Sequence, residues 1–286
     1  MTDLRKLLVV RPGDFQLAAV DPDGKPGLPD KKAVRKDPKG WAAEQITAIG
    51  AELAGYQERL FASAKEGATT RRVLLLLQAM DCGGKDGTVR NVMRSMNPVG
   101  IKAVSFGPPD DEERQHDFLW RIRRALPPAG YVGVFNRSQY EDVLVVRVHN
   151  LVPEDVWSQR YDQINAFEAE QVASGLTMVK VMLHISPEEQ RERLLARLDD
   201  PTKRWKYNPG DVDERGRWAD YQQAYQDALT RCSTDAAPWY VVPANRKWYR
   251  NWAVATLLRQ AMSEADPGYP EPDFDVAAER ARVLAS

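Results

Sequence analysis

Five short apolar runs alternate with longer stretches of helical spacing along the chain. The runs cover residues 73–79, 101–106, 131–135, 177–185 and 239–242. The run VLLLL at residues 73–77 shows no period-two alternation, which is typical of a strand that is covered on both faces. The pattern predicts an α/β fold of three layers, αβα, around a five-stranded parallel sheet.

Apolar residues at three- and four-residue steps predict the helices between and beyond these strands. They are expected over residues 41–64, 85–96, 110–126, 138–149, 153–174, 187–198, 212–232 and 246–262. Five prolines among residues 1–39 indicate an arm or a wrapping segment. Residues 40–263 then form one domain, and residues 264–286 form a C-terminal tail. Residues 199–210 are too basic and too broken for a core and are expected to form a mobile cap.

The composition excludes several classes of function. The chain has 286 residues, with 40 Lys and Arg against 41 Asp and Glu, so no global positive field attracts nucleic acid or anionic lipid. The longest apolar run is far shorter than the roughly 20 residues that span a bilayer. The N-terminus carries no secretory apolar region, and two isolated cysteines, Cys82 and Cys232, argue against a disulfide framework. We expect no membrane and no nucleic-acid partner, a cytoplasmic location, and any anion site to be local.

The strongest local signal is the sequence AMDCGGKDGT at residues 79–88, directly after the first predicted strand. A glycine-rich turn that opens a helix directs backbone N–H groups toward one point, where phosphate can bind, and Lys85 adds a full charge. Against the template GxxxxGK[ST], Gly84 and Lys85 match, but Ala79 replaces the first glycine and Asp86 replaces the Mg²⁺-binding Ser or Thr. A glycine-rich turn with a solvated lysine is the alternative. The predicted phosphate contacts are Cys82, Gly83, Gly84, Lys85, Asp86, Gly87 and Thr88.

Two further signals lie at the end of the third strand and in the cap. A P-loop enzyme normally has an Asp near Mg²⁺ at this strand end, whereas Asn136 supplies oxygen without charge and could simply cap the next helix. Arg137 is placed to clamp phosphate. The mixture of cations and an aromatic residue around the cap can close over a polyanion, with Trp205 stacking on a base, although a solvated, salt-bridged face is the alternative. The cap candidates are Arg193, Arg197, Lys203, Arg204, Trp205 and Lys206.

Four ordered motifs together resemble the family-2 polyphosphate kinases, most closely their class III members. They are QAMDCGGKDGT at residues 78–88, DEERQHDFLWR at 111–121, FNRS at 135–138 and DDPTKRWK at 199–206. The resemblance covers residues 41–262. It implies a P-loop kinase fold similar to thymidylate kinase, with a helical lid around residues 187–231 and a homotetrameric assembly. It also implies transfer of the terminal phosphoryl group between inorganic polyphosphate and AMP, ADP or ATP.

The resemblance also implies roles for individual residues. Lys85 would hold phosphates, Asp81 would bind Mg²⁺ from the loop, and Arg137 would steady the transferred phosphoryl group. The lid cations would contact polyphosphate or nucleotide. Asn136 stands where the family has the Walker B Asp, so the metal site would consist of Asp81 and Asn136.

Asn136 therefore predicts a chain that is weakly active or inactive, through either an inactivating replacement or natural variation. Two other functions remain open. One is an ATP-dependent nucleoside monophosphate kinase, and the other is a non-catalytic protein that binds nucleotide or polyphosphate.

Overall fold

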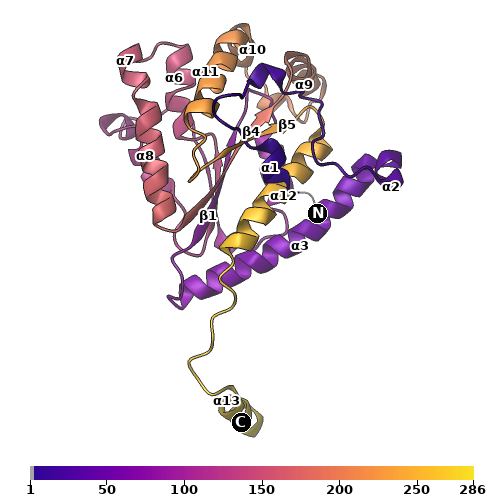
Figure 1. Cartoon of the computed structure of the whole chain (residues 1–286), viewed down its shortest axis with the longest axis vertical. Coiled ribbons are helices and arrows are strands. Elements are labelled where there is room, and N and C mark those ends of the chain that lie inside the picture. Colours follow the sequence, from indigo (N-terminus) through magenta and orange to yellow (C-terminus); the bar gives the residue numbers. More distant parts are fainter. Residues whose placement is uncertain (1–2) are drawn as a thin grey trace.

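Five parallel strands form the central sheet of the computed structural model, which describes residues 3–286 (Figure 1). The strands are β1 (Arg72–Gln78), β2 (Ile101–Ser105), β3 (Val132–Asn136), β4 (Leu176–His184) and β5 (Trp239–Pro243), in the order β2-β3-β1-β4-β5. The predicted five-stranded parallel sheet is confirmed, and each predicted strand boundary lies within one residue of the observed one. Because all strands run the same way, the loops after β1, β3, β4 and β5 meet at one edge of the sheet.

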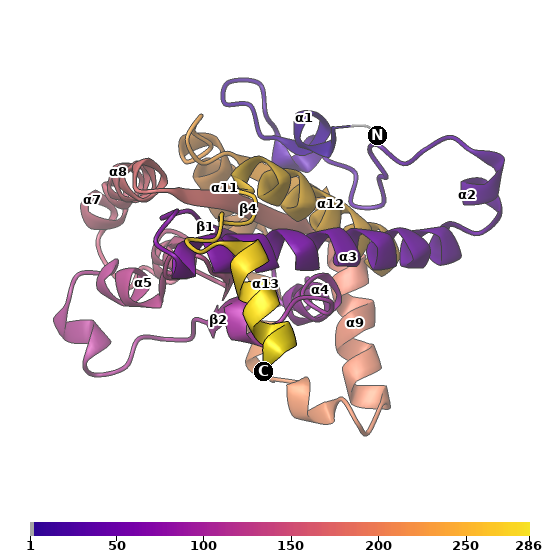
Figure 2. The same ribbon diagram turned by 90° about the horizontal axis from the view of Figure 1, so that it is seen from below.

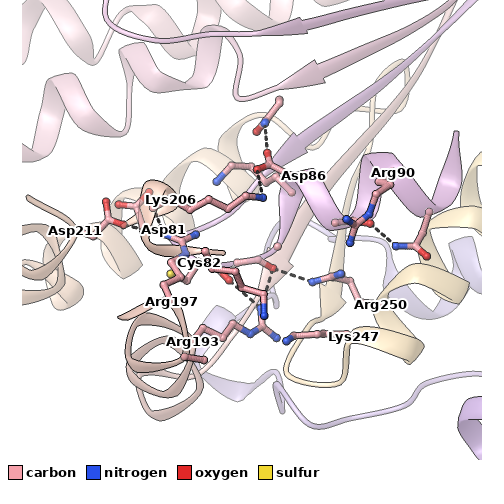
Figure 3. A pocket seen from close by; sticks show the side chains of 18 of the residues that line it. Asp81, Cys82, Asp86, Arg90, Arg193, Arg197, Lys206, Asp211, Lys247 and Arg250 are labelled. Atoms are coloured by element: carbon pink, nitrogen blue, oxygen red, sulfur yellow. Dashed lines mark hydrogen bonds and ion pairs between the residues drawn. The ribbon is translucent and has the colours of Figure 1, made fainter. Parts of the chain in front are cut away.

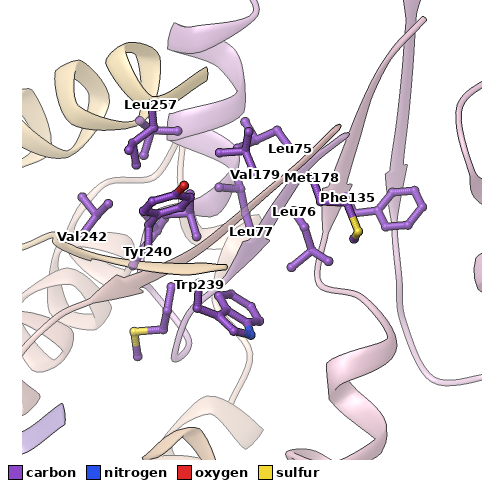
Figure 4. Packing of buried hydrophobic residues seen from close by; sticks show 14 of the residues in the cluster. Leu75, Leu76, Leu77, Phe135, Met178, Val179, Trp239, Tyr240, Val242 and Leu257 are labelled. Carbon is purple, nitrogen blue, oxygen red and sulfur yellow. The ribbon is translucent and has the colours of Figure 1, made fainter. Parts of the chain in front are cut away.

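Helices cover both faces of the sheet, which confirms the three-layer architecture. The long helices α3 (Pro38–Lys65) and α12 (Lys247–Ala265) pack against each other on one face, and α6 to α8 lie on the other (Figure 1). The apolar side chains of β1 are buried between them, with Leu257 of α12 above the sheet and Trp239 of β5 below it (Figure 4). Full burial of one such side chain contributes about 1.5–3 kcal/mol. None of the helices within residues 3–286 combines the length and apolarity needed to cross a membrane.

Several long predicted helices are interrupted. The prediction of one continuous helix at residues 110–126 is wrong. The segment instead contains the 3₁₀ turn η3 (Glu113–Gln115) and the helix α5 (Trp120–Ala125). The Asp110 carboxylate accepts from the Glu113 N–H, and the Asp117 carboxylate accepts from the Leu119 N–H. Each acid therefore starts a turn of its own, with extended backbone between them at His116.

Three other predicted helices are also divided, and the first helix after β1 is shorter than predicted. The remaining segments are α4 (Lys85–Val92), η4 (Gln139–Asp142), α6 (Val145–Val148), α7 (Glu154–Trp157), α8 (Arg160–Ala173), α9 (Pro187–Asp199), η5 (Arg204–Lys206), α10 (Gly210–Gly216) and α11 (Trp218–Arg231). Residues 138–149 divide at Val143 and Leu144, within a run of β-branched residues that disfavour a continuous helix.

The N-terminal segment lies against the main body of the chain. It contains α1 (Leu4–Leu8), η1 (Leu17–Ala19) and α2 (Lys32–Lys36), and η2 (Pro98–Gly100) later precedes β2. Leu4, Leu8 and Leu17 are buried, and the Val10 N–H donates to the Trp239 carbonyl at 2.8 Å. The segment thus covers the edge of β5. At the other end, α13 (Val276–Ala285) follows an extended stretch and stands away from the body (Figure 1); seen from below, it lies in front of the body (Figure 2).

Candidate active site

The loop at residues 79–84, here called the glycine-rich loop, joins β1 to α4 and needs glycine at two positions. A Cβ at Gly83 would lie 2.8 Å from the Met80 carbonyl oxygen, to which the Gly83 N–H donates. Gly84 has a φ of 98°, in the left-handed region, and a Cβ there would overlap the Arg250 guanidinium. These two glycines let the loop turn sharply, so that the first N–H groups of α4 face the open edge of the sheet.

A cavity of about 510 Å³ lies over the glycine-rich loop, and we call it the basic cavity (Figure 3). Nine cationic and three acidic side chains line it, so its local charge is strongly positive although the whole chain is nearly neutral. Positive charge is therefore concentrated at the place where the sequence predicts a local anion site. Its charged lining residues are Asp81, Lys85, Asp86, Arg90, Arg137, Arg193, Arg197, Lys203, Lys206, Asp211, Lys247 and Arg250.

Asp81, Lys85 and Arg137 meet at the floor of this cavity. The Lys85 ammonium donates to the Ala79 carbonyl at 3.0 Å, and Arg137 Nη2 donates to Asp81 Oδ1 at 3.3 Å. Burial and the nearby Arg137 charge lower the pKa of Lys85. Lys85 and Arg137 are thus two cations held close together in partial isolation from water, an arrangement that a bound anion would stabilise.

Asn136 and Asp86 approach each other from β3 and α4. Asn136 Nδ2 donates to Asp86 Oδ1 at 2.8 Å, and the other oxygen of Asp86 lies 3.8 Å from the Lys206 ammonium. The amide oxygen of Asn136 is buried and has no hydrogen-bond partner. A buried acceptor without a donor is costly in a finished structure, so this oxygen is available to a ligand.

These oxygens bear on whether the site can hold Mg²⁺. Within residues 3–286, no group of three His, Cys, Asp or Glu side chains is close enough to hold a metal alone. Mg²⁺, however, usually binds through one or two carboxylates and completes its shell with water and substrate phosphates. Asp81, Asp86 and Asn136, whose side-chain oxygen is unpartnered, all line the basic cavity and offer oxygen ligands of that kind, so the residues present fit the ion.

The structure uses every N–H donor of Arg193 for the protein itself. Its Nη1 donates to the carbonyls of Cys82 and Gly83 at 2.9 and 3.2 Å, and its Nη2 donates to those of residues 244–245. Its Nε donates to Glu189 at 2.6 Å. Arg193 therefore fastens α9 to the glycine-rich loop and to the end of β5.

Other predicted lid residues divide between the cavity and the outside. Arg197, Lys203 and Lys206 all line the basic cavity. Arg197 also forms an ion pair with Asp211 at 3.1 Å. Arg204 and Trp205 do not line this cavity; the Trp205 side chain is 78% exposed and donates to the Thr202 carbonyl. Thr88 also lies outside, because its buried hydroxyl donates to the Gly84 carbonyl at 3.1 Å.

Sequence reasoning missed the contribution of α12. Lys247, Arg250 and Asn251 reach the basic cavity from the first turn of this helix. Arg250 is 3% exposed and appears in none of the ion pairs found among residues 3–286, and burial and Arg193 lower its pKa to about 10. The sequence did contain a signal, because residues 247, 250 and 251 lie on one face of a predicted helix. That helix is far from the motifs along the chain, so nothing in the sequence linked it to the site.

A second cavity, of about 520 Å³, lies on the other side of Arg137, and we call it the apolar-walled cavity. Its apolar walls include Pro108, Phe118 and Val152. Charged residues also line it, namely Glu113, Arg114, Asp117, Arg121, Arg137, Glu141, Asp142 and Arg160. A smaller cavity of about 260 Å³, lined in part by Asp81, Arg137 and Glu141, joins the two. Arg137 lines all three cavities, so it stands where ligands from the two larger ones would meet.

Comparisons with known proteins point to one family. The family model for Polyphosphate kinase 2 (PPK2) matches residues 39–269. An AMP/ADP-polyphosphate phosphotransferase from Meiothermus ruber is 44% identical over 270 residues, covering 94% of this chain and 97% of that relative. An ADP-polyphosphate phosphotransferase from Rhodopseudomonas palustris is 42% identical over 77% of this chain and 78% of its own length. The crystal structure of polyphosphate kinase 2 from Arthrobacter aurescens has a TM-score of 0.93 and 49% identity, covering 100% of this chain and 98% of that one.

Proposed function

The chain belongs to the polyphosphate kinase 2 family, and on this premise we propose that it transfers the terminal phosphoryl group between inorganic polyphosphate and adenine nucleotides. The acceptors are AMP, which becomes ADP, and ADP, which becomes ATP, and the reverse reactions follow the same path. The observation that carries the proposal is the junction at Arg137 between a strongly basic cavity and one with apolar walls.

Polyphosphate is assigned to the basic cavity because only a polyanion uses so many cations in one place. Arg250 is buried and Lys85 half-buried beneath the cavity, Lys247 reaches it from an exposed position, and Lys203 and Lys206 reach the same space from the lid segment, residues 199–210. Arg193, whose donors are all used, contributes by holding the carbonyls of Cys82 and Gly83 so that the N–H side of the loop faces the phosphates.

The nucleotide is assigned to the apolar-walled cavity. A nucleoside base requires an apolar surface with polar groups beside it. Phe118 and Val152 provide such a surface, and the charged residues of the same cavity, Glu141 among them, provide the polar groups. The nucleotide phosphate then faces Arg137, and the terminal phosphoryl group of polyphosphate approaches from the opposite side. Catalysis consists of placing the attacking nucleotide oxygen and the leaving polyphosphate oxygen in line with the transferred phosphorus, and of stabilising the charge of the transferred group.

Mg²⁺ is the proposed metal, and Asp81, Asp86 and Asn136 would hold it. The ion would neutralise charge on the phosphate oxygens. Asp81 also fixes Arg137 through their 3.3 Å contact, while Lys85 provides a fixed positive charge at the phosphates. Both cations act on the transferred group without forming a covalent intermediate.

Asn136 in place of a carboxylate leaves the proposed metal site with one negative charge fewer. The sequence-based hypothesis of a weakly active chain follows from that loss, and Asn136→Asp tests it. We expect the variant to turn over faster and to need less Mg²⁺ for half-maximal rate, about 10-fold less. If its turnover is equal or lower, the Asn136 amide, with its bond to Asp86, belongs to a fully working site.

The decisive experiment is an exchange of donors. The chain is incubated with Mg²⁺ and AMP or ADP, with either polyphosphate or ATP as donor, and the products are separated by chromatography. Polyphosphate-dependent formation of ADP and ATP supports the proposal, with Lys85→Met as the inactive control. If ATP alone phosphorylates AMP, the chain is a nucleoside monophosphate kinase, and binding without turnover in both the chain and Asn136→Asp indicates a non-catalytic binding protein.

The assembly and location are further parts of the proposal. The family resemblance supports a homotetramer, which light scattering of the purified chain would measure. A cytoplasmic location is also proposed, and the two free, buried cysteines agree with a reducing compartment.

A further inference from the structure

A fully buried ion pair lies behind the site, in a place that neither cavity reaches. Lys180 of β4 and Glu168 of α8 are both 0% exposed, and Lys180 Nζ lies 2.5 Å from Glu168 Oε2. The other carboxylate oxygen, Oε1, accepts from the Gln139 side-chain amide and from the Tyr140 hydroxyl, each at 2.9 Å. Lys180 also donates to the Tyr140 hydroxyl at 2.9 Å and to the Cys232 carbonyl at 2.7 Å.

This buried polar network, formed by Gln139, Tyr140, Glu168 and Lys180, satisfies both of its charged groups. The three ammonium protons of Lys180 have three acceptors, and both carboxylate oxygens of Glu168 have donors. A buried ion pair is seldom more stabilising than apolar side chains of the same size, since both charges lose their water. Fold stability alone therefore gives no reason for charges at this position.

The network holds the backbone that immediately follows Arg137. Arg137 has a φ of 64°, in the left-handed region that a residue with a large side chain rarely adopts. Its N–H donates to the Leu77 carbonyl of β1 at 3.0 Å, which fixes one side of the residue. On the other side, Gln139 and Tyr140 of η4 are anchored to Glu168. A strained conformation of this kind persists only where the surrounding structure imposes it.

We propose that Glu168 and Lys180 are positioning residues for phosphoryl transfer, which hold η4 in the core so that Arg137 faces the junction of the two cavities. The proposal rests on the proposed function, because it assigns Arg137 to the transferred group. Glu168 and Lys180 touch no substrate and act only through Gln139 and Tyr140. Breaking the anchor lets the backbone at Arg137 relax and moves its guanidinium away from Asp81.

The main test replaces three of the four network residues by apolar side chains of similar volume, in the triple variant Tyr140→Phe, Glu168→Leu, Lys180→Met. No buried charge is left unpaired, so we expect the variant to fold with an unchanged circular dichroism spectrum. Because a small misplacement of a catalytic group is costly, kcat should fall about 10- to 100-fold while KM for each substrate changes less than about 2-fold. A folded triple variant with the wild-type kcat would overturn the proposal.

Tyr140→Phe alone decides the matter if the triple variant fails to fold. It removes one hydroxyl and keeps the ion pair, and we expect kcat to fall about 3-fold. Tyr161→Phe is the matched control, because it also removes a buried hydroxyl, from the same face of the sheet, but that hydroxyl accepts from Arg147 and has no bond to η4. Equal kcat values for the two variants would overturn the proposal.

A double-mutant cycle with Arg137→Ala shows whether the effect passes through Arg137. On the Arg137→Ala background, the network variants should lower kcat by less than about 2-fold, because the group they position is already absent. If the full loss persists there, the network acts on something other than Arg137 and the proposal is wrong.

Crystal structures separate this proposal from the proposed function. If the chain transfers no phosphoryl group from polyphosphate, the proposed function fails, but the position of Arg137 can still be compared between Tyr140→Phe and Tyr161→Phe. Movement of the guanidinium away from Asp81 in the first variant alone supports the anchor, and an unmoved Arg137 in both variants refutes it.

Discussion

The glycine-rich loop and the lid segment bring cations to the same cavity but hold them in different ways. The Lys85 ammonium donates a hydrogen bond to a carbonyl of the glycine-rich loop, and Arg193 donates to the carbonyls of Cys82 and Gly83. Lys203 and Lys206 are half exposed, and each lies near an aspartate, Asp200 and Asp86 respectively. The loop therefore presents a rigid site, whereas the lid supplies charges that water already stabilises.

This difference predicts that the two regions respond differently to substitution. A cation held away from water lowers the stability of the ligand-free protein and raises its affinity for an anionic ligand. A solvated cation changes stability and affinity only slightly. Substitutions in the glycine-rich loop should thus have large effects on activity that do not depend on salt. Substitutions in the lid should have small effects on activity that added salt screens.

Lys85→Met should have the largest effect on activity and little cost in stability. We expect kcat/KM to fall at least about 100-fold, since a fixed charge at the transferred phosphoryl group is lost. Burial lowers the pKa of Lys85 in the folded chain, so the charged lysine disfavours folding at neutral pH, and this penalty disappears above its ordinary pKa of 10.5. The variant's Tm at pH 7 should equal or exceed that of the wild type, as measured by calorimetry without ligands.

Polyphosphate provides the control for this variant. Added polyphosphate should raise the Tm of the wild type by stabilising the folded state, and the rise should be much smaller in Lys85→Met. A variant that keeps the wild-type activity, or that melts well below the wild type without ligand, contradicts the assigned role of Lys85.

Gly84→Ala should give the next largest effect, on activity and stability together. The left-handed φ alone costs about 1–2 kcal/mol in the free energy of unfolding, and displacement of the Arg250 guanidinium adds to it. Gly67→Ala is the matched control, because Gly67 has a φ of 71° with open space around it. Urea unfolding of both variants should show a greater loss for Gly84→Ala, and only this variant should lose activity, by about 10-fold or more.

Lys206→Ala tests the lid. We expect KM for polyphosphate to rise about 3-fold in low salt, and the difference from the wild type to shrink as KCl is added. Lys65→Ala, at the far end of α3, changes the net charge equally without touching the cavity. A loss larger than that of Lys85→Met, or one unaffected by salt, would remove the distinction between the two regions.

The sequence predicted the glycine-rich loop well because its information is local. Strand, glycines and lysine lie within a few residues, and their geometry follows from backbone sterics and from the start of a helix. The five strands were equally accessible, because apolar runs that are buried on both faces are distinctive. The interrupted helix at residues 110–126 was not, since side chains such as Asp110 and Asp117 compete with the helix for backbone N–H groups.

Long-range contacts account for what the sequence could not predict. Arg250 reaches the cavity only because α12 packs across the sheet, and its spacing from Lys85 along the chain gives no indication of this. Arg193 was predicted to contact polyphosphate or nucleotide, yet its acceptors come from three separate segments. Local charge patterns show where cations are available, but the tertiary packing determines which donors remain free.

Trp205→Ala should have the smallest effect and separates the two regions most finely. The sequence suggested that this ring stacks on a base, but it is 78% exposed, outside the cavity, with the Lys206 ammonium 4.9 Å from its centre. Because the ring orients a lid cation without meeting the ligand, we expect kcat to be unchanged and KM for polyphosphate to rise less than about 2-fold. A much larger rise in KM for AMP or ADP would instead show that the lid closes during turnover and brings Trp205 onto the nucleotide, so that the lid contributes a specific contact as the glycine-rich loop does.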